Sequence, residues 1–337
     1  MRKLSLANLP TKIQKMERFS EENGVNVYIK RDDQTGSEWS GNKIRKLEFS
    51  VQEAIDKGCN LLITCGGIQS NHCRATVSVA TYFGMKSAVL LRISDTPPVE
   101  GNYFLDLLLG ADVKFCNADE YRTSRMEIMQ KMADEYAAQG YKPYIIPEGA
   151  SNGVGTLGYY NAMNEIVQQE KEMGTVFDTI VIATGSGGTC AGLNIANIIK
   201  GYGKRIIAMA VCDDVDYFQK VALKISREAL SYLVEQKEIS LDKAEKLADS
   251  LQQTDFEVND KYVGIGYALS RPEELEHIKR LARLEGIVFD PVYTGKATYG
   301  MVNELKPGGN LRTAKNILFI HTGGLYGLFP VSKQFKF

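Results

Sequence analysis

Short apolar runs alternate with helical patterns through the first half of the chain. Four of the apolar runs predict strands, at 60–67, 86–93, 111–116 and 141–147. The helices expected between them cover 70–84, 102–110 and 119–139. Strands that alternate with helices favour an open parallel sheet with right-handed crossovers.

A second series of the same kind follows. Its expected strands lie at 177–184, 205–212, 286–290 and 315–324. Its expected helices cover 156–173, 189–201, two segments of 214–253 that separate near Ile239 and Ser240, and 271–286. We therefore predict an α/β protein with two open twisted parallel-sheet domains and a ligand cleft between them.

The composition agrees with such a protein and excludes several classes. At about 150 residues per domain, 337 residues correspond to about two domains. Lys+Arg 40 against Asp+Glu 41 gives a net charge of -1, which argues against a nucleic-acid partner. No apolar run reaches the roughly 18–20 residues of a membrane span, and the first residues lack the apolar core of a signal peptide. We expect a cytoplasmic protein with neither nucleic acid nor membrane as a partner.

The cysteines and histidines offer little metal chemistry. No C-x-x-C pair occurs among the six cysteines: Cys59, Cys65, Cys73, Cys116, Cys190 and Cys212. We interpret them as buried, reduced thiols. The alternative, a zinc site made of Cys65, His72 and Cys73, has a spacing that matches no zinc pattern, so no metal is expected.

The strongest local signal is the segment 181–193, in which a buried strand runs through Gly185-Ser186-Gly187-Gly188-Thr189 into a helix. The glycines leave backbone N–H groups unobstructed, and the helix N-terminus adds partial positive charge. The segment therefore predicts a phosphate site. The alternative is a tight turn without a ligand.

Two familiar nucleotide motifs do not match. Cys190 occupies the place of the third glycine in a dinucleotide fingerprint, and the Gly36–Gly41 spacing is followed by Asn42-Lys43 rather than Lys-Ser/Thr. We therefore expect a single phosphate group.

Lys43 is a candidate nucleophile. Ile44 and Leu47 define one apolar helix face, which places Lys43 in the first helical turn. A cation is disfavoured there by the helix dipole, so that position would lower the pKa of the amine and free it to react. The alternative is an ordinary surface lysine.

Three further loops follow expected strands. Ser70 opens a helix after Gly66-Gly67 and suggests a second anion site, suited to a carboxylate, although helix capping alone also explains it. The loop 290–296 carries Tyr293, and 321–324 carries Thr322. Packing is the alternative explanation for Tyr293.

A competing motif points to different chemistry. The segment 149–153, centred on Ser151, matches the G-x-S-x-G elbow of serine hydrolases. That function would also need an acid and a histidine, either His277 or His321. It leaves both Lys43 and the predicted phosphate loop unexplained.

Taken together, the motifs resemble the pyridoxal-phosphate family that contains D-cysteine desulfhydrase and 1-aminocyclopropane-1-carboxylate (ACC) deaminase. The matching segments, in order, are IKRDD (29–33), GNKIRKLEF (41–49), GGIQSNH (66–72), PEGASN (147–152), TGSGGT (184–189), DPVYTGK (290–296) and HTGG (321–324). The resemblance implies fold type II, similar to the tryptophan synthase β subunit, and a homodimer. It also implies a smaller domain at 46–154 and a larger one made of 1–45 and 155–337.

The resemblance further implies a role for each candidate. Lys43 would carry pyridoxal 5'-phosphate, and Lys43, Ser70, Tyr267 and Tyr293 would be catalytic. The other cofactor-binding residues would be Asn71, Thr184, Gly185, Ser186, Gly187, Gly188, Thr189, Tyr293 and Thr322. The substrate would contact Ser70, Asn71, His72 and Thr294.

The resemblance implies a lyase that acts on a small amino acid. ACC deaminases carry glutamate after the tyrosine of DPVY, whereas this chain has Thr294, as in the desulfhydrases. We therefore expect β-elimination of D-cysteine to pyruvate, hydrogen sulfide and ammonia. ACC deamination and L-cysteate sulfo-lyase activity are the alternatives within the family.

Overall fold

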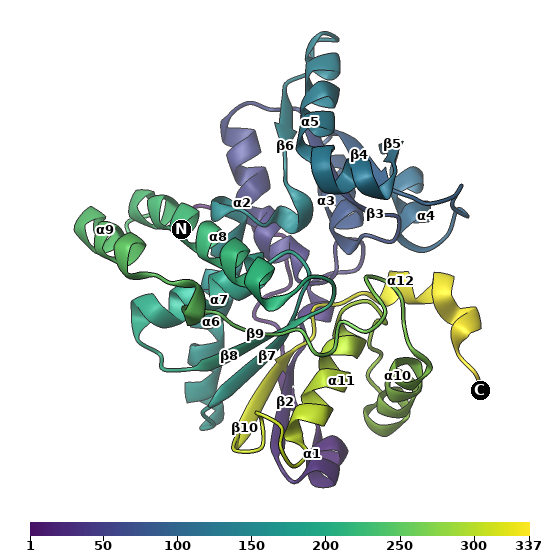
Figure 1. The fold of residues 1–337 in the computed structure, drawn as a ribbon. Coiled ribbons are helices and arrows are strands. Elements are labelled where there is room, and N and C mark those ends of the chain that lie inside the picture. Colours follow the sequence, from purple (N-terminus) through teal and green to yellow (C-terminus); the bar gives the residue numbers. More distant parts are fainter.

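The computed structural model describes residues 1–337 and contains two separate β-sheets (Figure 1). The strands are β1 (Ile13–Lys15), β2 (Asn26–Lys30), β3 (Leu61–Gly67), β4 (Lys86–Arg92), β5 (Asp112–Cys116), β6 (Pro143–Ile145), β7 (Thr179–Thr184), β8 (Arg205–Ala210), β9 (Glu257–Asn259) and β10 (Asn316–Ile320). Six form one sheet in the order β1-β2-β10-β7-β8-β9, and four form the other in the order β5-β4-β3-β6.

Twelve α-helices surround the sheets. They are α1 (Glu17–Asn23), α2 (Lys43–Asp56), α3 (Asn71–Tyr82), α4 (Gly101–Leu108), α5 (Ala118–Ala137), α6 (Gly153–Met173), α7 (Gly188–Lys200), α8 (Val215–Glu235), α9 (Leu241–Ser250), α10 (Pro272–Glu285), α11 (Thr294–Leu305) and α12 (Leu325–Leu328). The predicted α/β class and the two-sheet organisation are confirmed.

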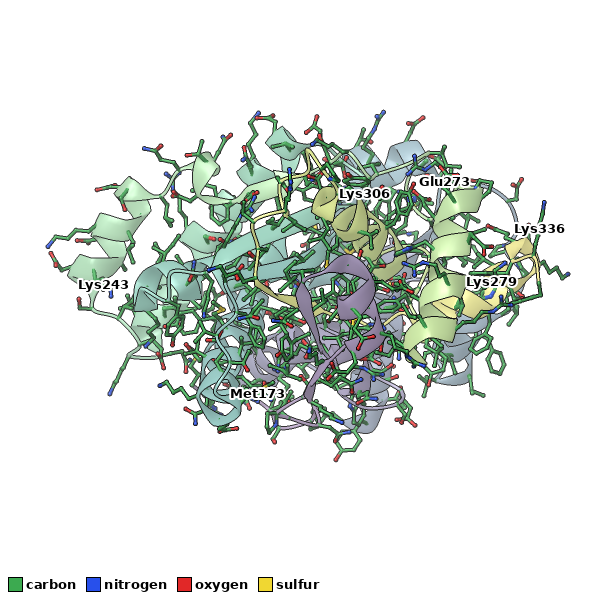
Figure 2. The ribbon with its side chains drawn as sticks, turned by 90° about the horizontal axis from the view of Figure 1, so that it is seen from below. Met173, Lys243, Glu273, Lys279, Lys306 and Lys336 are labelled. Carbon is green, nitrogen blue, oxygen red and sulfur yellow. The ribbon has the colours of Figure 1, made fainter.

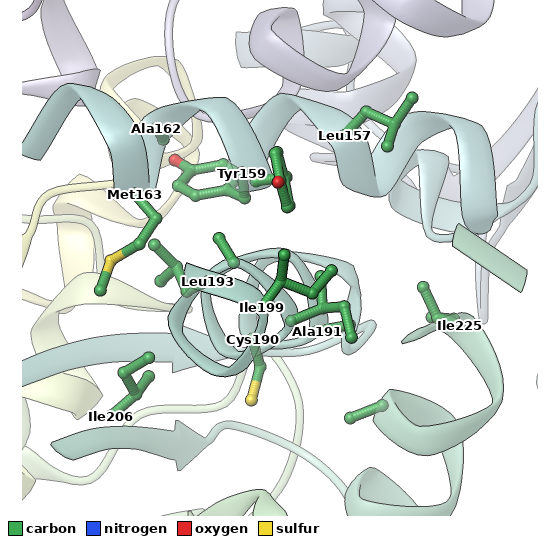
Figure 3. Close-up of a cluster of buried hydrophobic side chains, with 14 of the residues drawn as sticks. Leu157, Tyr159, Ala162, Met163, Cys190, Ala191, Leu193, Ile199, Ile206 and Ile225 are labelled. Carbon is green, nitrogen blue, oxygen red and sulfur yellow. The ribbon is translucent and has the colours of Figure 1, made fainter. Parts of the chain in front are cut away.

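The six-stranded sheet is covered on both faces, because its side chains alternate between two apolar clusters. Ile180 and Ile182 of β7 pack with α6, α7 and α8, while Val181 and Ala183 pack with α10 and α11. This alternation follows from the two-residue period of a strand. Figure 3 shows part of the first cluster, where Leu193 of α7 lies between Met163 of α6 and Ile206 of β8.

The four-stranded sheet is entirely parallel and is also covered on both faces. Ile63 of β3 and Leu90 of β4 pack beneath α5, whereas Leu62 packs with α2 and α3. The expected β-α-β-α-β-α-β series is therefore confirmed. The proposed domain boundaries at 45/46 and 154/155 fall in the first turns of α2 and α6.

The expected strand at 286–290 is wrong. Ile287 and Phe289 point into the apolar cluster beneath α10 and α11, and Val288 is 43% exposed, so the segment has a strand-like burial pattern. It pairs with no strand, and the central strand β10 is already bonded on both sides, to β2 and to β7. The segment runs as an extended connection instead.

Three short strands escaped sequence analysis. β2 pairs in parallel with β10, and β1 adds an antiparallel strand at the sheet edge. β9 covers the opposite edge by pairing with β8. With three to five residues each, these strands are too short to show a clear hydrophobic period.

Charged side chains mark the two ends of the molecule. Figure 2 shows Lys243 of α9 at one end of the molecule and Lys279 of α10 at the other, beside Lys336. Lys279 Nζ donates a hydrogen bond to the carbonyl oxygen of Lys336, 2.8 Å away. None of the helices combines the length and the apolar character that crossing a membrane requires.

Candidate active site

A cavity lies between the two sheets, at the carboxyl ends of β3 and β7. Its walls come from segments far apart in the sequence: Asn42, Lys43, Gly66, Gly67, Ser70, Asn71, His72, Glu148, Gly149, Ala183, Thr184, Gly185, Ser186, Gly187, Thr189, Tyr267, Tyr293 and Thr322. The structure thus brings together all predicted site residues except Gly188 and Thr294.

The predicted phosphate loop runs from the end of β7 to the start of α7. Gly187 adopts a left-handed conformation, with φ of +79°, and Gly188 is the first helical residue. The N-cap residue is a glycine, so no N-cap side chain accepts the next N–H groups of the helix, those of Thr189 and Cys190. A β-carbon on Gly188 would lie 2.7 Å from Ser151 Oγ, so the loop needs glycine there. The arrangement fits a bound phosphate.

Lys43 is the first residue of α2, as the sequence predicts. The backbone before it is fixed by Asn42, whose N–H donates to the Thr322 carbonyl at 3.1 Å and whose Nδ2 donates to Thr189 Oγ1 at 3.2 Å. These bonds join the lysine to both β10 and the phosphate loop. Burial lowers the pKa of the Lys43 amine to about 8, against the opposing charge of Glu148.

Gly149 lies between the lysine and the phosphate loop. It has a φ of +64°, and a β-carbon there would clash with Ser186 Oγ and lie 2.9 Å from Lys43 Nζ. The reactive amine and the loop therefore approach each other across a position that only glycine fits. Sequence analysis did not single out Gly149 for this role, although it lies in the PEGASN motif.

Lys46, one turn after Lys43, lies beneath the phosphate loop and was also missed. It is fully buried, and its Nζ lies 3.2 Å from both the Gly149 carbonyl and Ser151 Oγ. Burial lowers its pKa well below the usual value, and Lys43 adds to the effect. A second lysine without a carboxylate partner suits a site that receives an anion.

The serine-hydrolase alternative is wrong. Ser151 Oγ donates to Ser186 Oγ at 2.9 Å and accepts from the Gly188 N–H, so it braces the phosphate loop. None of the three histidines contacts it. His277 pairs with Thr298 Oγ1, His321 pairs with the Val288 carbonyl, and His72 pairs with Thr64 Oγ1.

The second anion site lies at the N-terminus of α3. Ser70 caps this helix by accepting the Cys73 N–H at 3.1 Å, and its side chain also faces the cavity. Asn71 Oδ1 accepts from Asn102 Nδ2 at 3.0 Å, which fixes the orientation of its amide. Burial lowers the pKa of His72, so its ring is neutral near pH 7. Capping and anion binding are therefore compatible roles for this turn.

Two tyrosines from the larger sheet's side face this turn. Tyr267 Oη and Tyr293 Oη are 2.5 Å apart, and both side chains line the cavity. Burial raises the pKa of both phenols. Asp290 fixes the start of α11 by accepting the N–H groups of Val292, Tyr293 and Thr294 at 2.8–2.9 Å.

Thr294 does not line the cavity. It is fully buried, and its hydroxyl donates to Asp290 Oδ1 at 2.7 Å while accepting the Asp290 N–H at 2.9 Å. Its predicted contact with the substrate therefore stays a prediction, and in this structure Asp290 engages its hydroxyl group. Thr322 does line the cavity, at the carboxyl end of β10.

A buried ion network anchors α2 on its other side. Arg45 forms two-pronged contacts with Asp32 at 2.8 and 2.9 Å and with Glu165 at 2.9 Å. Lys30 Nζ adds a bond of 2.7 Å to Glu165. Local sequence spacing cannot identify these partners of Arg45, because they lie 13 and 120 positions away. The network fixes the turn that carries Lys43.

The six cysteines are all free thiols, and four of them are buried. No group of three or more His, Cys, Asp or Glu side chains is arranged to hold a metal ion. Cys65 Sγ accepts a hydrogen bond from Tyr121 Oη at 3.6 Å, which is a packing contact beneath α5.

The cavity places a partly deprotonated amine opposite a glycine-lined helix N-terminus. An aldehyde with a phosphate arm needs these two features in one site, because the amine binds the carbonyl and the helix binds the anion. The fold and the cavity therefore define a pyridoxal-phosphate enzyme. Lys43 would hold the carbonyl carbon, and residues 184–189 would hold the phosphate.

Comparison with known proteins leads to the same class. Residues 4–323 match the family model of pyridoxal-phosphate-dependent enzymes, and the chain belongs to that family. It is 39% identical to the bifunctional D-cysteine desulfhydrase/ACC deaminase of Arabidopsis thaliana, over 98% of this chain and 80% of that protein. It is also 39% identical to a putative ACC deaminase of Thermotoga maritima, over 98% of this chain and 99% of that protein.

A solved structure shows the same fold. The crystal structure of an ACC deaminase homologue superposes with a TM-score of 0.86 at 35% identity, covering 99% of this chain and 95% of that one. The expected family, fold type and cofactor are therefore confirmed. The chain is a pyridoxal-phosphate-dependent lyase.

Proposed function

We propose that this lyase eliminates the β-substituent of D-cysteine. The reaction takes one D-cysteine and one water to one pyruvate, one hydrogen sulfide and one ammonia, with no net oxidation or reduction. Two bonds of the substrate break, one between the β-carbon and sulfur and one between the α-carbon and hydrogen. Hydrolysis then exchanges nitrogen for oxygen. When bound, pyridoxal phosphate supplies the electron sink that makes the α-hydrogen acidic.

The chain's own residues would hold the substrate by its carboxylate. Ser70 and Asn71 stand at the N-terminus of α3, where backbone N–H groups and the helix dipole favour an anion. His72 is buried and neutral, so it adds a hydrogen-bonding group without adding charge. This turn would therefore fix the α-carbon relative to Lys43 and Tyr293.

Three groups near the cavity could move the α-proton. Lys43 has an amine whose lowered pKa provides the free base at mildly alkaline pH. Tyr293 and Tyr267 share a short hydroxyl–hydroxyl contact on the opposite wall. We assign these three as the catalytic proton carriers and Ser70 as the residue that positions the substrate.

The observation that carries the choice of substrate is the acid content of the cavity. Glu148 is the only carboxylate among its lining residues, and Thr322, just after β10, contributes a neutral hydroxyl. A neutral partner leaves a pyridine nitrogen without a proton and so moderates its electron demand. That condition suits elimination from a substrate with an α-hydrogen.

ACC deamination is the second candidate, since one relative is named for both activities. ACC has no α-hydrogen, so opening its ring demands a stronger electron sink. Here Thr294, where the resemblance places glutamate in ACC deaminases, is neutral and fully engaged by Asp290. We propose that Thr294 favours elimination through its hold on the turn that carries Tyr293.

A substrate panel tests the proposal. Purified holoenzyme is incubated with D-cysteine, L-cysteine, D-serine, ACC and L-cysteate, and both keto acid and sulfide are measured. We expect equal amounts of pyruvate and sulfide from D-cysteine, and negligible 2-oxobutanoate from ACC. Faster release of 2-oxobutanoate from ACC than of pyruvate from D-cysteine would refute the substrate assignment. Lys43→Ala protein serves as the control for uncatalysed breakdown.

The quaternary structure and the location in the cell are part of the same proposal. We propose a homodimer that acts on a small amino acid, as the family resemblance implies, and that works in the cytoplasm, where its free cysteines would stay reduced. Sedimentation equilibrium of the holoenzyme measures the first directly, and the expected mass is twice 37.4 kDa.

A further inference from the structure

Arg92, the last residue of β4, is a cation without a carboxylate partner next to the cavity. Its guanidinium carbon lies 5.2 Å from the ring centre of Tyr121 and 5.1 Å from that of Tyr267. It forms neither a hydrogen bond nor an ion pair with another side chain. The charge is therefore held between two aromatic faces, one from α5 and one from the loop that carries Tyr267.

Arg125 provides an internal comparison. Its guanidinium lies 5.4 Å from the same Tyr121 ring, but its Nε is 3.8 Å from Glu148 Oε2. The charge of Arg125 is thus balanced by a carboxylate. The charge of Arg92 is not, so its field reaches the neighbouring tyrosines less diminished.

Arg92 and Tyr267 meet at the end of β3. A β-carbon on Gly67 would lie 3.5 Å from Tyr267 Cε1 and 3.9 Å from Arg92 Nη2. The loop behind Tyr267 is fixed by Lys296, whose Nζ donates to the carbonyls of Val263 and Gly266 at 2.7 and 2.6 Å. Tyr267 is therefore held against both Arg92 and Tyr293.

The two tyrosines experience different charges. Burial raises the pKa of Tyr267 most, the hydrogen bond with Tyr293 lowers it, and Glu148 and Cys212 raise it further. Arg92 is the one cation among these neighbours, and its charge stabilises a tyrosinate there. Tyr293 faces Asp290, Glu148 and Tyr267, all of which disfavour a negative charge. The hydroxyl groups are 2.5 Å apart, so one proton can bridge them.

We propose that Arg92 is a positioning residue that makes Tyr267 the first member of the tyrosine pair to lose its proton. The remaining proton then stays on Tyr293, whose hydroxyl donates to the Tyr267 oxygen. Tyr267 is the acceptor that faces the cavity, and Tyr293 is the donor. Any role of this donor–acceptor order in turnover rests on the proposed function. The order of ionisation itself does not.

The test measures the ionisation of each tyrosine without a substrate. A 3,5-difluorotyrosine, which ionises closer to neutral pH than tyrosine, replaces Tyr267 in one holoenzyme sample and Tyr293 in another. The fluorine NMR shift is followed against pH. We expect the label at 267 to ionise at a lower pH than the label at 293. The reverse order would overturn the proposal, and this comparison needs no change at Arg92.

Arg92 is then changed in the protein labelled at 267. Arg92→Gln should raise the ionisation midpoint by about 1 pH unit or more, because a nearby opposite charge typically shifts a pKa by that amount. Arg92→Lys should restore part of the shift. The comparison variant Arg125→Gln should shift the midpoint less than Arg92→Gln does, because the Arg125 charge is paired with Glu148. An unchanged midpoint in Arg92→Gln, or an equal shift in Arg125→Gln, would refute the role of Arg92.

Failure of this inference is distinguishable from failure of the proposed function. The titrations report protonation in the resting holoenzyme, so they give the same answer whichever amino acid is the substrate. A protein that acts on ACC rather than D-cysteine can still show the predicted order of ionisation. A protein that eliminates sulfide from D-cysteine can also show the opposite order.

Discussion

Helix α2 carries two kinds of buried cation within a single turn, and they differ in their partners. Arg45 faces Asp32 and Glu165, and each of its contacts with these carboxylates is shorter than 3 Å. Lys43 and Lys46 face the cavity and the underside of the phosphate loop, and neither forms an ion pair. The first cation is paired with carboxylates of the fold, whereas the other two have no carboxylate partner.

This difference separates charged side chains that stabilise the fold from those that take part in chemistry. A buried ion pair is costly to break, because the remaining partner is left without compensation. A buried lysine without a carboxylate has a lowered pKa instead, so its amine can act as a nucleophile, and a bound anion would supply the missing opposite charge. Arg92 and Arg125 repeat the contrast in the smaller sheet, with Glu148 as the partner of Arg125 alone.

The largest effect is expected from removing the Lys43 amine. Lys43→Ala should abolish covalent attachment of pyridoxal phosphate and lower kcat/KM for the amino-acid substrate by about 10³-fold or more. Borohydride reduction followed by peptide mapping measures the attachment. Lys57→Ala, at the exposed C-terminal end of the same helix, is the control. Modification of Lys46 or Lys296 in the unaltered protein would contradict the assignment.

The comparison also shows how far the sequence could lead. The position of Lys43 in a first helical turn and the glycines at 185–188 are local patterns, and the structure has both as expected. The partners of Arg45 could not be predicted, because Asp32 and Glu165 lie on different elements that meet only in the fold. The same holds for Arg92, which is an ordinary strand end until the loop of Tyr267 packs on it.

The misplaced strand at 286–290 and the position of Thr294 have a related cause. The apolar alternation of Ile287 and Phe289 reports burial, but pairing depends on whether a neighbouring strand is free to bond. Likewise, the DPVYT motif places Thr294 beside Tyr293 in sequence, although successive residues at a helix start point in different directions. The hydrophobic pattern of a sequence indicates which side chains are buried. It does not indicate which strand a segment pairs with or the direction in which each side chain points.

The second prediction compares the stability effect of removing the paired cation, Arg45, with that of removing the unpaired cation, Lys46. Arg45→Met should lower the free energy of unfolding by about 3–5 kcal/mol, because Asp32 and Glu165 lose a buried partner. Lys46→Met leaves no carboxylate unpaired and should change it by about 1 kcal/mol or less. Urea unfolding of the apo-protein, followed by circular dichroism, measures both. Equal losses in the two variants would remove the distinction between charged side chains that stabilise the fold and those that take part in chemistry.

When anion binding is measured, Lys46→Met should have the larger effect of the same two variants. Lys46→Met should weaken the binding of inorganic phosphate to the apo-protein, since Lys46 lies beneath residues 186–188. Titration calorimetry gives this affinity directly. An unaltered phosphate affinity in Lys46→Met would show that Lys46 only fills space.

The third prediction concerns the gap between Lys43 and the loop. Gly149→Ala should weaken the affinity of the apo-protein for pyridoxal phosphate about tenfold or more, since 1.4 kcal/mol of strain beside the ligand is sufficient. The added carbon would collide with Ser186 Oγ and approach Lys43 Nζ. Gly174→Ala is the matched control, because Gly174 has nearly the same φ of +65° but no atom within 4 Å.

Equilibrium dialysis of both glycine variants distinguishes local collision from backbone strain. Both substitutions force a left-handed residue and should cost about 1 kcal/mol of stability. Only Gly149→Ala should also lose cofactor affinity. If both lose it equally, the effect arises from the backbone, and the close approach of Lys43 to the loop has no part in binding.

The smallest expected effect is a gradual dependence of the cofactor-attachment rate on pH, which is set by the pKa of Lys43. A lysine at its ordinary value of 10.5 would supply little free amine near neutral pH, whereas a pKa of about 8 supplies much more. Raising the pH deprotonates the amine, so the rate of cofactor attachment to the apo-protein should rise by up to about tenfold per pH unit below pH 8 and level off above it. Stopped-flow absorbance measures this rate. The reaction of the cofactor with a small free amine in the same buffers corrects for the pH dependence of the cofactor's aldehyde.

A rate that keeps rising tenfold per unit up to pH 10 would mean that burial does not lower the pKa of Lys43. The unpaired lysine would then carry its proton as firmly as a surface residue, and the lack of a carboxylate partner would not distinguish it from one.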